Sequence, residues 1–211
     1  MKQLSTVFAL LLTLFSTVSC AQGKTGKATK TLETSSMETG KKILVAFFSH
    51  TGENYAVGNI TKGNTHIIAE MIAESTDGKL FEIVSVKEYP KTYNACVEVA
   101  KKEKEAGARP AVKDDIAVED YDVVFIGYPN WWGDMPMAVY TFIERHRWAG
   151  KTIIPFCTHE GSGLSNTEKY IANACKGAKV EKGLAVRGAT AQNKQEQARK
   201  AVVQWLERLG L

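Results

Sequence analysis

Cysteine and histidine are scarce in this 211-residue sequence, and their scarcity argues against two kinds of protein. One of the four cysteines, Cys20, lies at the end of an N-terminal apolar segment, and no two cysteines have the Cys-x-x-Cys spacing. The other three are an odd number, so a disulfide framework is not expected. Four scattered histidines without ligand spacing argue against a metal site.

The sequence also lacks two nucleotide-binding motifs and a basic patch. Neither Gly-x-Gly-x-x-Gly nor Gly-x-x-x-x-Gly-Lys-Ser/Thr occurs, so dinucleotide and nucleoside triphosphate sites lose support. From Ile43 onward, 21 Lys or Arg residues balance 21 Asp or Glu residues, and the net charge of +4 belongs to the preceding stretch. We therefore expect no nucleic-acid partner.

The N-terminus has the pattern of an export signal. Lys2 is followed by an apolar run at 7–15 and then by small residues, and this run is short for a membrane-spanning helix. Two processing routes stay open, which are cleavage before Gln22 and recognition of 17–20 as a lipobox that makes Cys20 an acylated N-terminus. Either route predicts an exported protein that is periplasmic or lipid-anchored at the cell envelope. Membrane contact is expected only through such an anchor.

The composition divides the chain into three parts. We expect a signal sequence at 1–21, or one ending before Cys20, then a flexible tether at 22–41, and a domain at 42–211. In the domain, short apolar runs typical of buried strands alternate with helical patterns. The expected strands are 43–48, 80–86, 123–126, 153–156 and 183–186, and the expected helices are 66–75, 93–106, 136–145, 166–175 and 194–209.

This alternation predicts an α/β fold, with an open parallel sheet covered by helices on both faces. An eight-stranded barrel needs a longer chain. In open parallel sheets, ligands bind beyond the carboxyl ends of the strands. The loops after the first, third and fourth strands are therefore the candidate site.

The first of these loops has the composition of a phosphate cradle. Ser49, Thr51 and Gly52 follow the first strand, and Asn64 and Thr65 open the first helix. Hydroxyl groups and free backbone N–H groups at a helix N-terminus bind anions well. The same residues also suit ordinary helix capping and a turn, so this loop alone decides nothing.

The other two loops carry aromatic and polar side chains. The segment 127–136 contains Trp131 and Trp132, whose faces suit stacking on a planar ring, although either could instead fill core. The segment 157–163 contains His159 beside Glu160, which could form an acid–base pair or simply order the loop. Cys157 has no implied partner that would make it a nucleophile.

Two strings in these loops resemble those of the flavodoxin superfamily, in particular a bacterial flavodoxin-like branch. They are Gly-Tyr-Pro-Asn-Trp-Trp-Gly-x-Met-Pro at 127–136 and Pro-Phe-Cys-Thr-His-Glu-Gly-Ser-Gly at 155–163. The resemblance extends over 42–211. It implies a doubly wound, five-stranded parallel sheet in the order 2-1-3-4-5, with FMN bound at the carboxyl ends of the strands.

The resemblance also implies a role for each loop by position. The FMN phosphate would be held by Ser49, Thr51, Gly52, Asn64 and Thr65. The isoalloxazine would be lined by Pro129, Asn130, Trp131, Trp132 and Gly133. Its other edge would be bounded by Thr158, His159, Glu160, Gly161 and Gly163. The flavin would carry the chemistry, with His159 and Glu160 as modulators, and the Gly133-Asp134 carbonyl would change orientation with the redox state.

One departure from the family pattern affects the phosphate loop. Residues 53–62 are inserted between the two halves of the cradle, where they either fold over the flavin or displace the loop. Lys62 could neutralise the phosphate, a task that flavodoxins generally leave to backbone and hydroxyl groups.

Three functions stay open at this stage. The first is electron transfer through non-covalent FMN to a redox partner protein or a small acceptor. The second is an FMN-dependent oxidoreductase of the NAD(P)H/quinone type. The third is a flavin-free interaction module, which would have the loop 49–65 closed over the phosphate position.

Overall fold

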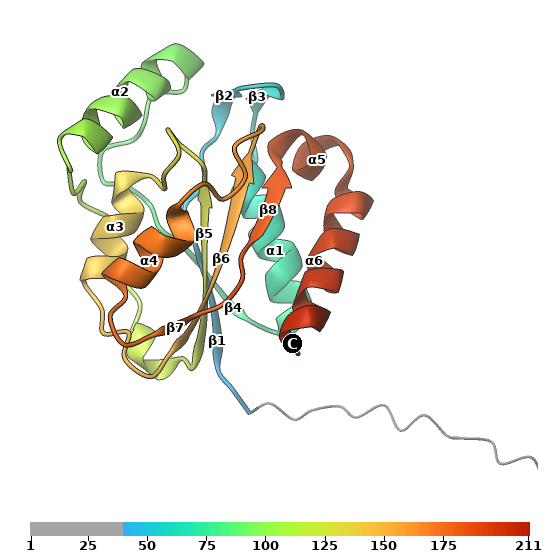
Figure 1. The fold of residues 1–211 in the computed structure, drawn as a ribbon. Coiled ribbons are helices and arrows are strands. Elements are labelled where there is room, and N and C mark those ends of the chain that lie inside the picture. The colour runs from blue at the N-terminus through green and yellow to red at the C-terminus, as the bar shows by residue number, and fades with distance from the viewer. Residues whose placement is uncertain (1–39) are drawn as a thin grey trace, which may run out of the picture. The chain divides into compact units, whose positions relative to one another are not determined.

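The computed structural model describes residues 40–211, so the expected signal sequence and nearly all of the expected tether lie outside the described residues. Regular structure starts at β1 and ends with α6 (Figure 1). In chain order the elements are β1 (Ile43–Phe47), β2 (Gly52–Asn54), β3 (Gly58–Ile60), α1 (Asn64–Thr76), β4 (Lys79–Glu82), α2 (Tyr93–Glu105), the 3-10 helix η1 (Val118–Asp120), β5 (Val123–Pro129), α3 (Met137–Glu144), β6 (Thr152–His159), α4 (Thr167–Ala174), β7 (Lys179–Val180), β8 (Leu184–Arg187), α5 (Gly188–Asn193) and α6 (Gln195–Leu209).

The main sheet is parallel and has the order β4-β1-β5-β6-β7, with β8 also paired to β6. Both β7 and β8 pair with β6, so together they occupy the place of one edge strand. The predicted order 2-1-3-4-5 is therefore confirmed, with a fifth strand that is broken into two. Ile153 pairs with Val180 and Phe156 pairs with Leu184, so the edge carries one extra residue between the two pairs. That extra residue interrupts the ladder as a bulge does.

The two faces of the sheet are buried by two sets of helices because neighbouring strand residues point to opposite sides. Leu44 and Ala46 of β1 belong to a core with residues of α2, α3 and α4, whereas Val45 and Phe47 belong to a core with residues of α1 and α6. Figure 1 shows these two helix layers on either side of the sheet. Burial on both faces explains why β1, β5 and β6 are continuous apolar runs.

Several elements differ from the sequence-based expectation, including the short strand β7 and the 3-10 helix η1, which were not expected. The strand expected at 80–86 ends at Glu82, because the chain then leaves β1 and Ser85 pairs antiparallel with Val112. The insertion contains the antiparallel hairpin β2–β3. The short helix α5 precedes α6 and was not expected. Among the described helices, none is both long enough and apolar enough to cross a membrane.

Candidate functional site

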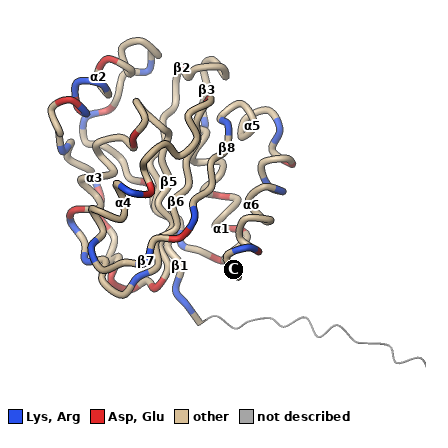
Figure 2. Tube along the Cα trace, viewed as in Figure 1, with Lys and Arg blue, Asp and Glu red and all other residues tan. Residues whose placement is uncertain are grey.

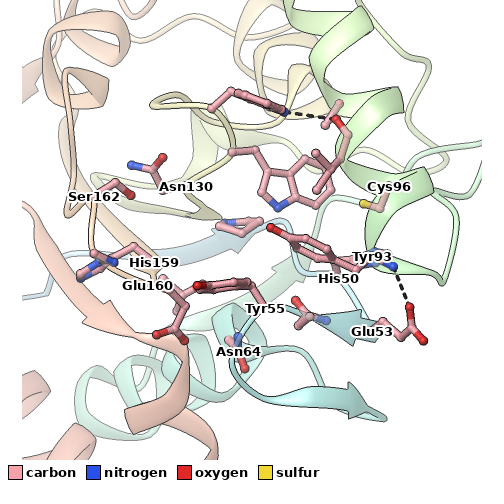
Figure 3. A pocket seen from close by; sticks show the side chains of 18 residues that line it. His50, Glu53, Tyr55, Asn64, Tyr93, Cys96, Asn130, His159, Glu160 and Ser162 are labelled. Carbon is pink, nitrogen blue, oxygen red and sulfur yellow. Dashed lines mark hydrogen bonds between the residues drawn. The ribbon is translucent and has the colours of Figure 1, made fainter.

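A cavity of about 430 Å³ lies beyond the carboxyl ends of β1, β5 and β6 (Figure 3). The loops after these three strands, the hairpin and α2 all contribute to its walls. The lining residues are His50, Glu53, Asn54, Tyr55, Asn64, Tyr93, Cys96, Val97, Ala100, Pro129, Asn130, Trp131, Trp132, Thr158, His159, Glu160, Gly161 and Ser162. The position agrees with the expectation that a parallel sheet binds ligands at this edge.

The hydroxyl groups of the first loop are used mainly to hold the loop together. The Ser49 hydroxyl accepts a hydrogen bond from the His66 N–H at 3.1 Å and so caps α1 from outside the helix. The Thr51 hydroxyl accepts from the Lys91 ammonium at 2.9 Å. Thr65 and Thr158 share a buried hydrogen bond of 2.7 Å between their hydroxyl groups. This last bond ties the start of α1 to the end of β6.

Asn64 is the residue of the predicted cradle whose side chain faces the cavity. Its Oδ1 accepts a hydrogen bond of 2.9 Å from the amide of Gln192 in α5. Gly188 makes room for it, because a Cβ at that position would lie 2.3 Å from Asn64 Nδ2. The amide of Asn64 is therefore oriented by a helix that comes much later in the chain.

Trp131 lies in an aromatic cluster at the wall of the cavity. Its ring makes edge contacts with Phe48, His50 and Tyr89, at centroid distances of 5.5, 5.8 and 5.1 Å. Such edge-to-face packing fixes the plane of the indole.

Trp132 and Gly133 form the tip of a tight turn. Both have positive φ, +58° and +74°, and the Trp131 and Asp134 backbones exchange hydrogen bonds of 2.8 and 3.1 Å. Two central residues with positive φ are typical of a type I′ turn. The indole of Trp132 donates to the Val97 carbonyl at 3.1 Å, so the half-exposed ring is held against α2.

Asn130 connects the turn to the third loop. Its amide nitrogen donates to the Gly163 carbonyl at 2.8 Å and to the Ser165 hydroxyl at 3.0 Å, and its Oδ1 accepts from the Gly133 N–H at 3.1 Å. Because one side-chain amide makes all these bonds, Asn130 sets the distance between the β5–α3 loop and the loop after β6.

His159 and Glu160 do not pair with each other in the third loop. His159 Nδ1 accepts a hydrogen bond from the Gly161 N–H at 2.9 Å, and Glu160 Oε1 accepts one from the Ala189 N–H at 2.7 Å. Partial burial, and secondarily Arg187, lower the pKa of His159 below its usual value. A neutral imidazole that accepts at Nδ1 carries its proton on Nε2. The geometry therefore fits loop ordering better than an acid–base pair.

The cavity brings together nine of the predicted site residues and leaves six outside its lining. Those that line it are Asn64, Pro129, Asn130, Trp131, Trp132, Thr158, His159, Glu160 and Gly161. Those that do not are Ser49, Thr51, Gly52, Thr65, Gly133 and Gly163. Most of the second group hold the loops that carry the first group. Lys62, considered for phosphate neutralisation, instead pairs with Glu70.

Several lining residues were not predicted. Four of them lie at helical spacing on one side of α2: Tyr93, Cys96, Val97 and Ala100. This spacing could have indicated a buried helix face, but the charged residues at 101–105 drew attention to the exposed side of the helix. Glu53, Asn54 and Tyr55 come from the hairpin, and His50 and Ser162 come from the strand-end loops.

His50 is a buried polar residue in this lining. It is 9% exposed, and its Nε2 has no hydrogen-bond partner within residues 40–211. Burial, with a smaller contribution from Lys91, lowers the pKa of His50 to about 4. The imidazole is therefore neutral near pH 7.

The cysteines of the described part of the chain are free thiols. Cys96, Cys157 and Cys175 are buried and free, and the Cys157 thiol donates to the Gly163 carbonyl at 3.2 Å. Burial raises the pKa of Cys157 to about 12, so its thiol stays protonated. No group of three or more His, Cys, Asp or Glu residues within 40–211 is arranged to hold a metal ion.

Comparisons with known proteins agree on one family. A family model described as flavodoxin matches residues 42–209. Two provisionally named flavoproteins of known structure are similar to this chain. The one from Bacteroides uniformis ATCC 8492 has 32% identity and a TM-score of 0.64, over 79% of this chain and 98% of that one. The one from Bacteroides eggerthii DSM 20697 has 30% identity and a TM-score of 0.63, over 81% of this chain and 99% of that one.

A flavoprotein from Lactobacillus acidophilus NCFM, solved in complex with FMN, has 23% identity and a TM-score of 0.54, over 74% of this chain and 99% of that one. At this identity the likeness concerns the fold alone. No curated protein matches the sequence. The family model covers most of the chain, and the two Bacteroides proteins match over almost their whole length, so this chain belongs to the flavodoxin family.

Proposed function

We propose that this protein binds FMN without a covalent bond and transfers electrons through it. The observation that carries the proposal is one cavity in which aromatic rings and the N-terminus of α1 face the same space. Its volume of about 430 Å³ is within the roughly 300–1,000 Å³ that is usual for cofactor sites. When bound, FMN supplies one- and two-electron redox chemistry, and the protein supplies position and electrostatics.

The start of α1 suits the phosphate of FMN. The His66 and Ile67 N–H groups already donate to Ser49 and Gly63. The N–H groups of Asn64 and Thr65 precede them, at the very start of the helix. Helix N-termini favour anions through such amides and through the helix dipole. The Asn64 amide adds a donor that Gln192 orients. We therefore assign the phosphate to this end of the cavity, with Ser49 and Thr65 acting through loop geometry.

The other end suits the isoalloxazine. Trp131 offers a ring whose plane is fixed by Phe48, His50 and Tyr89. Thr158, His159 and Gly161 line the neighbouring wall, where backbone and imidazole groups can hydrogen-bond a polar ring edge. We assign His159 to holding that edge with a proton on Nε2.

The same cavity argues against a flavin-free interaction module. That alternative calls for a loop 49–65 closed over the phosphate position, whereas Asn64 faces the cavity. Between the two redox alternatives, aromatic side chains of the hairpin and α2, Tyr55 and Tyr93, line the cavity and favour a covered ring. A covered ring suits a carrier better than an enzyme that must stack a second planar ring on the flavin.

FMN titration of the full-length protein tests the proposal. We expect flavin fluorescence to be quenched as FMN stacks near Trp131, and the quenching to weaken in a Trp131→Phe variant. The matched control is Trp205→Phe, which makes the same change in the core between α6 and the sheet. Unchanged flavin fluorescence up to tens of micromolar protein, which corresponds to roughly 6 kcal/mol of binding free energy, would overturn the FMN proposal.

A potentiometric titration of the FMN-loaded protein separates the two redox alternatives. A carrier should be reduced in two separate one-electron steps. A single two-electron step, together with rapid oxidation of a nicotinamide nucleotide, would favour the oxidoreductase instead.

Export is part of the proposal because of the N-terminal sequence pattern. The intact mass of the protein from its native envelope distinguishes the routes. A chain starting at Gln22 indicates cleavage, and a chain starting at a lipid-modified Cys20 indicates anchoring. A full-length chain in the cytoplasm would contradict export.

A further inference from the structure

The hairpin β2–β3 places an exposed aromatic residue at the cavity. Its strands have three residues each, and Tyr55 follows β2 at the turn. The Tyr55 side chain lines the cavity and the residue is 65% exposed, the highest value among the exposed large hydrophobic residues of 40–211. Exposing a large ring to water is unfavourable, so this position needs a reason.

Hydrogen bonds to the segment that leads into α2 fix the position of the hairpin. The Glu53 N–H donates to the Lys91 carbonyl at 2.7 Å, and Glu53 Oε2 accepts from the Tyr93 N–H at 2.9 Å. Gly52 allows this approach, because a Cβ there would lie 2.6 Å from the Lys91 carbonyl oxygen, and its φ is +102°. A two-stranded hairpin alone is marginal in water, so these bonds decide where Tyr55 stands.

Among the aromatic residues of 40–211, Tyr93 at the start of α2 is the neighbour of Tyr55. Their ring centroids are 6.0 Å apart and their planes are tilted by 35°. Figure 3 shows both rings extending from the hairpin and α2 side toward the wall that carries His159 and Glu160. Tyr93 is also exposed, so the pair leaves aromatic surface uncovered at the cavity.

We propose that Tyr55 is a stacking residue for the planar ring of the flavin, supplied by the inserted hairpin and supported by Tyr93. A planar ring has two faces, and Trp131 from the β5–α3 loop and Tyr55 from the hairpin line the same cavity. A bound ring would cover the exposed surface of Tyr55, which the protein by itself leaves in water. This inference rests on the proposed function, because it takes the ligand ring to be that of FMN.

Binding of FMN and of riboflavin to the full-length protein tests the proposal, because riboflavin has the same ring and no phosphate. Tyr55→Ala should raise the Kd of both ligands by the same factor, roughly three- to tenfold, which is the usual worth of one aromatic contact. Tyr55→Phe keeps the ring and should keep both Kd values. Asn59→Ala is the matched control, because Asn59 is exposed on the same hairpin and does not line the cavity.

Each other outcome overturns a defined part of the argument. Unchanged binding of both ligands to Tyr55→Ala overturns the stacking role and leaves the FMN proposal intact. A loss for FMN but not for riboflavin also overturns it, since the hairpin would then act on the phosphate loop. A wild-type protein that binds neither ligand overturns the proposed function and this inference together.

Discussion

Gly127 of β5 and Phe156 of β6 fit together at the level of single atoms. A Cβ at Gly127 would lie 2.1 Å from Cζ of Phe156, so the ring occupies the space that any side chain at position 127 would need. The two residues are direct partners in the sheet, and each belongs to one of the two sequence strings, 127–136 and 155–163. We expect Gly127→Ala to lower the free energy of unfolding by about 1–3 kcal/mol, because the core has no room for the added methyl group. Urea denaturation measures this change in the free energy of unfolding.

A second substitution tests the stated cause of that loss. If the clash with Phe156 is responsible, Phe156→Leu in the Gly127→Ala background should cost less than Phe156→Leu alone. Gly40→Ala, where nothing lies within 4 Å of the added Cβ, should leave stability unchanged. Additive effects of the two substitutions would show that the cause lies elsewhere.

His50 makes stability depend on pH, because burial lowers its pKa to about 4 from an ordinary 6.5. The unfolded chain binds this proton more readily than the folded protein, so protonation favours unfolding. The contribution is complete above the ordinary pKa and is lost as the pH falls toward 4. Between about pH 7 and about pH 5 we expect the wild type to lose about 2 kcal/mol through this group.

Urea denaturation at the two pH values checks the contribution of His50. A His50→Gln variant, which cannot take up the proton, should lose about 2 kcal/mol less over the same interval. Equal losses of stability in both proteins would show that the pKa of His50 in the folded protein is the same as in the unfolded chain.

Sequence reasoning about single residues worked where the chemistry is local. Trp131, Trp132 and Asn130 follow a buried strand, so their place at the carboxyl edge could be predicted. The partner of Asn64 could not, because Gln192 lies 128 residues away and reaches it only through the packing of α5 on α1. Tyr55 was likewise out of reach, since its place depends on bonds from Glu53 to the segment before α2.

At the scale of elements, α2 depends on the hairpin for its N-terminal cap. Thr92, at the N-cap position, makes no side-chain hydrogen bond, whereas Glu53 accepts from the Tyr93 N–H. A carboxylate at a helix N-terminus is also favoured by the helix dipole. We expect Glu53→Ala to cost about 1 kcal/mol and to speed hydrogen exchange in the first turn of α2.

Hydrogen exchange followed by mass spectrometry checks the role of Glu53. The control is Glu98→Ala, because Glu98 is exposed within α2 and makes none of the capping contacts. The first turn of α2 should exchange faster in Glu53→Ala alone. The same rate in both variants would mean that α2 holds its own N-terminus.

Elements could be predicted where burial leaves a mark in the sequence. β1, β5 and β6 are apolar on both faces and were evident. In β7, Lys179 is exposed and Val180 is only partly buried, so this strand left no apolar run. The strands of the hairpin, Gly-Glu-Asn and Gly-Asn-Ile, have low strand propensity and form because a distant segment anchors them.

At the scale of the whole molecule, charges of both signs are interspersed over the described part of the chain (Figure 2). Lys101 lies 5.6 Å from the ring centroid of Trp132, and Lys104 lies 3.9 Å from Asp134, while Glu103 and Glu105 belong to the same helix. Neither sign therefore dominates beside the cavity, and the field that a partner meets there is weak.

This balance predicts weak electrostatic steering of electron acceptors. The rate at which reduced, FMN-loaded protein passes electrons to a small acceptor should change less than about tenfold with ionic strength, for an anionic and for a cationic acceptor alike. A protein with one dominant charge would speed one acceptor and slow the other at low salt. Stopped-flow measurements with both acceptors at low and high salt decide between the two cases. Opposite, steep salt dependences would show that a local group of charges, and not the near-zero net charge from Ile43 onward, governs the encounter.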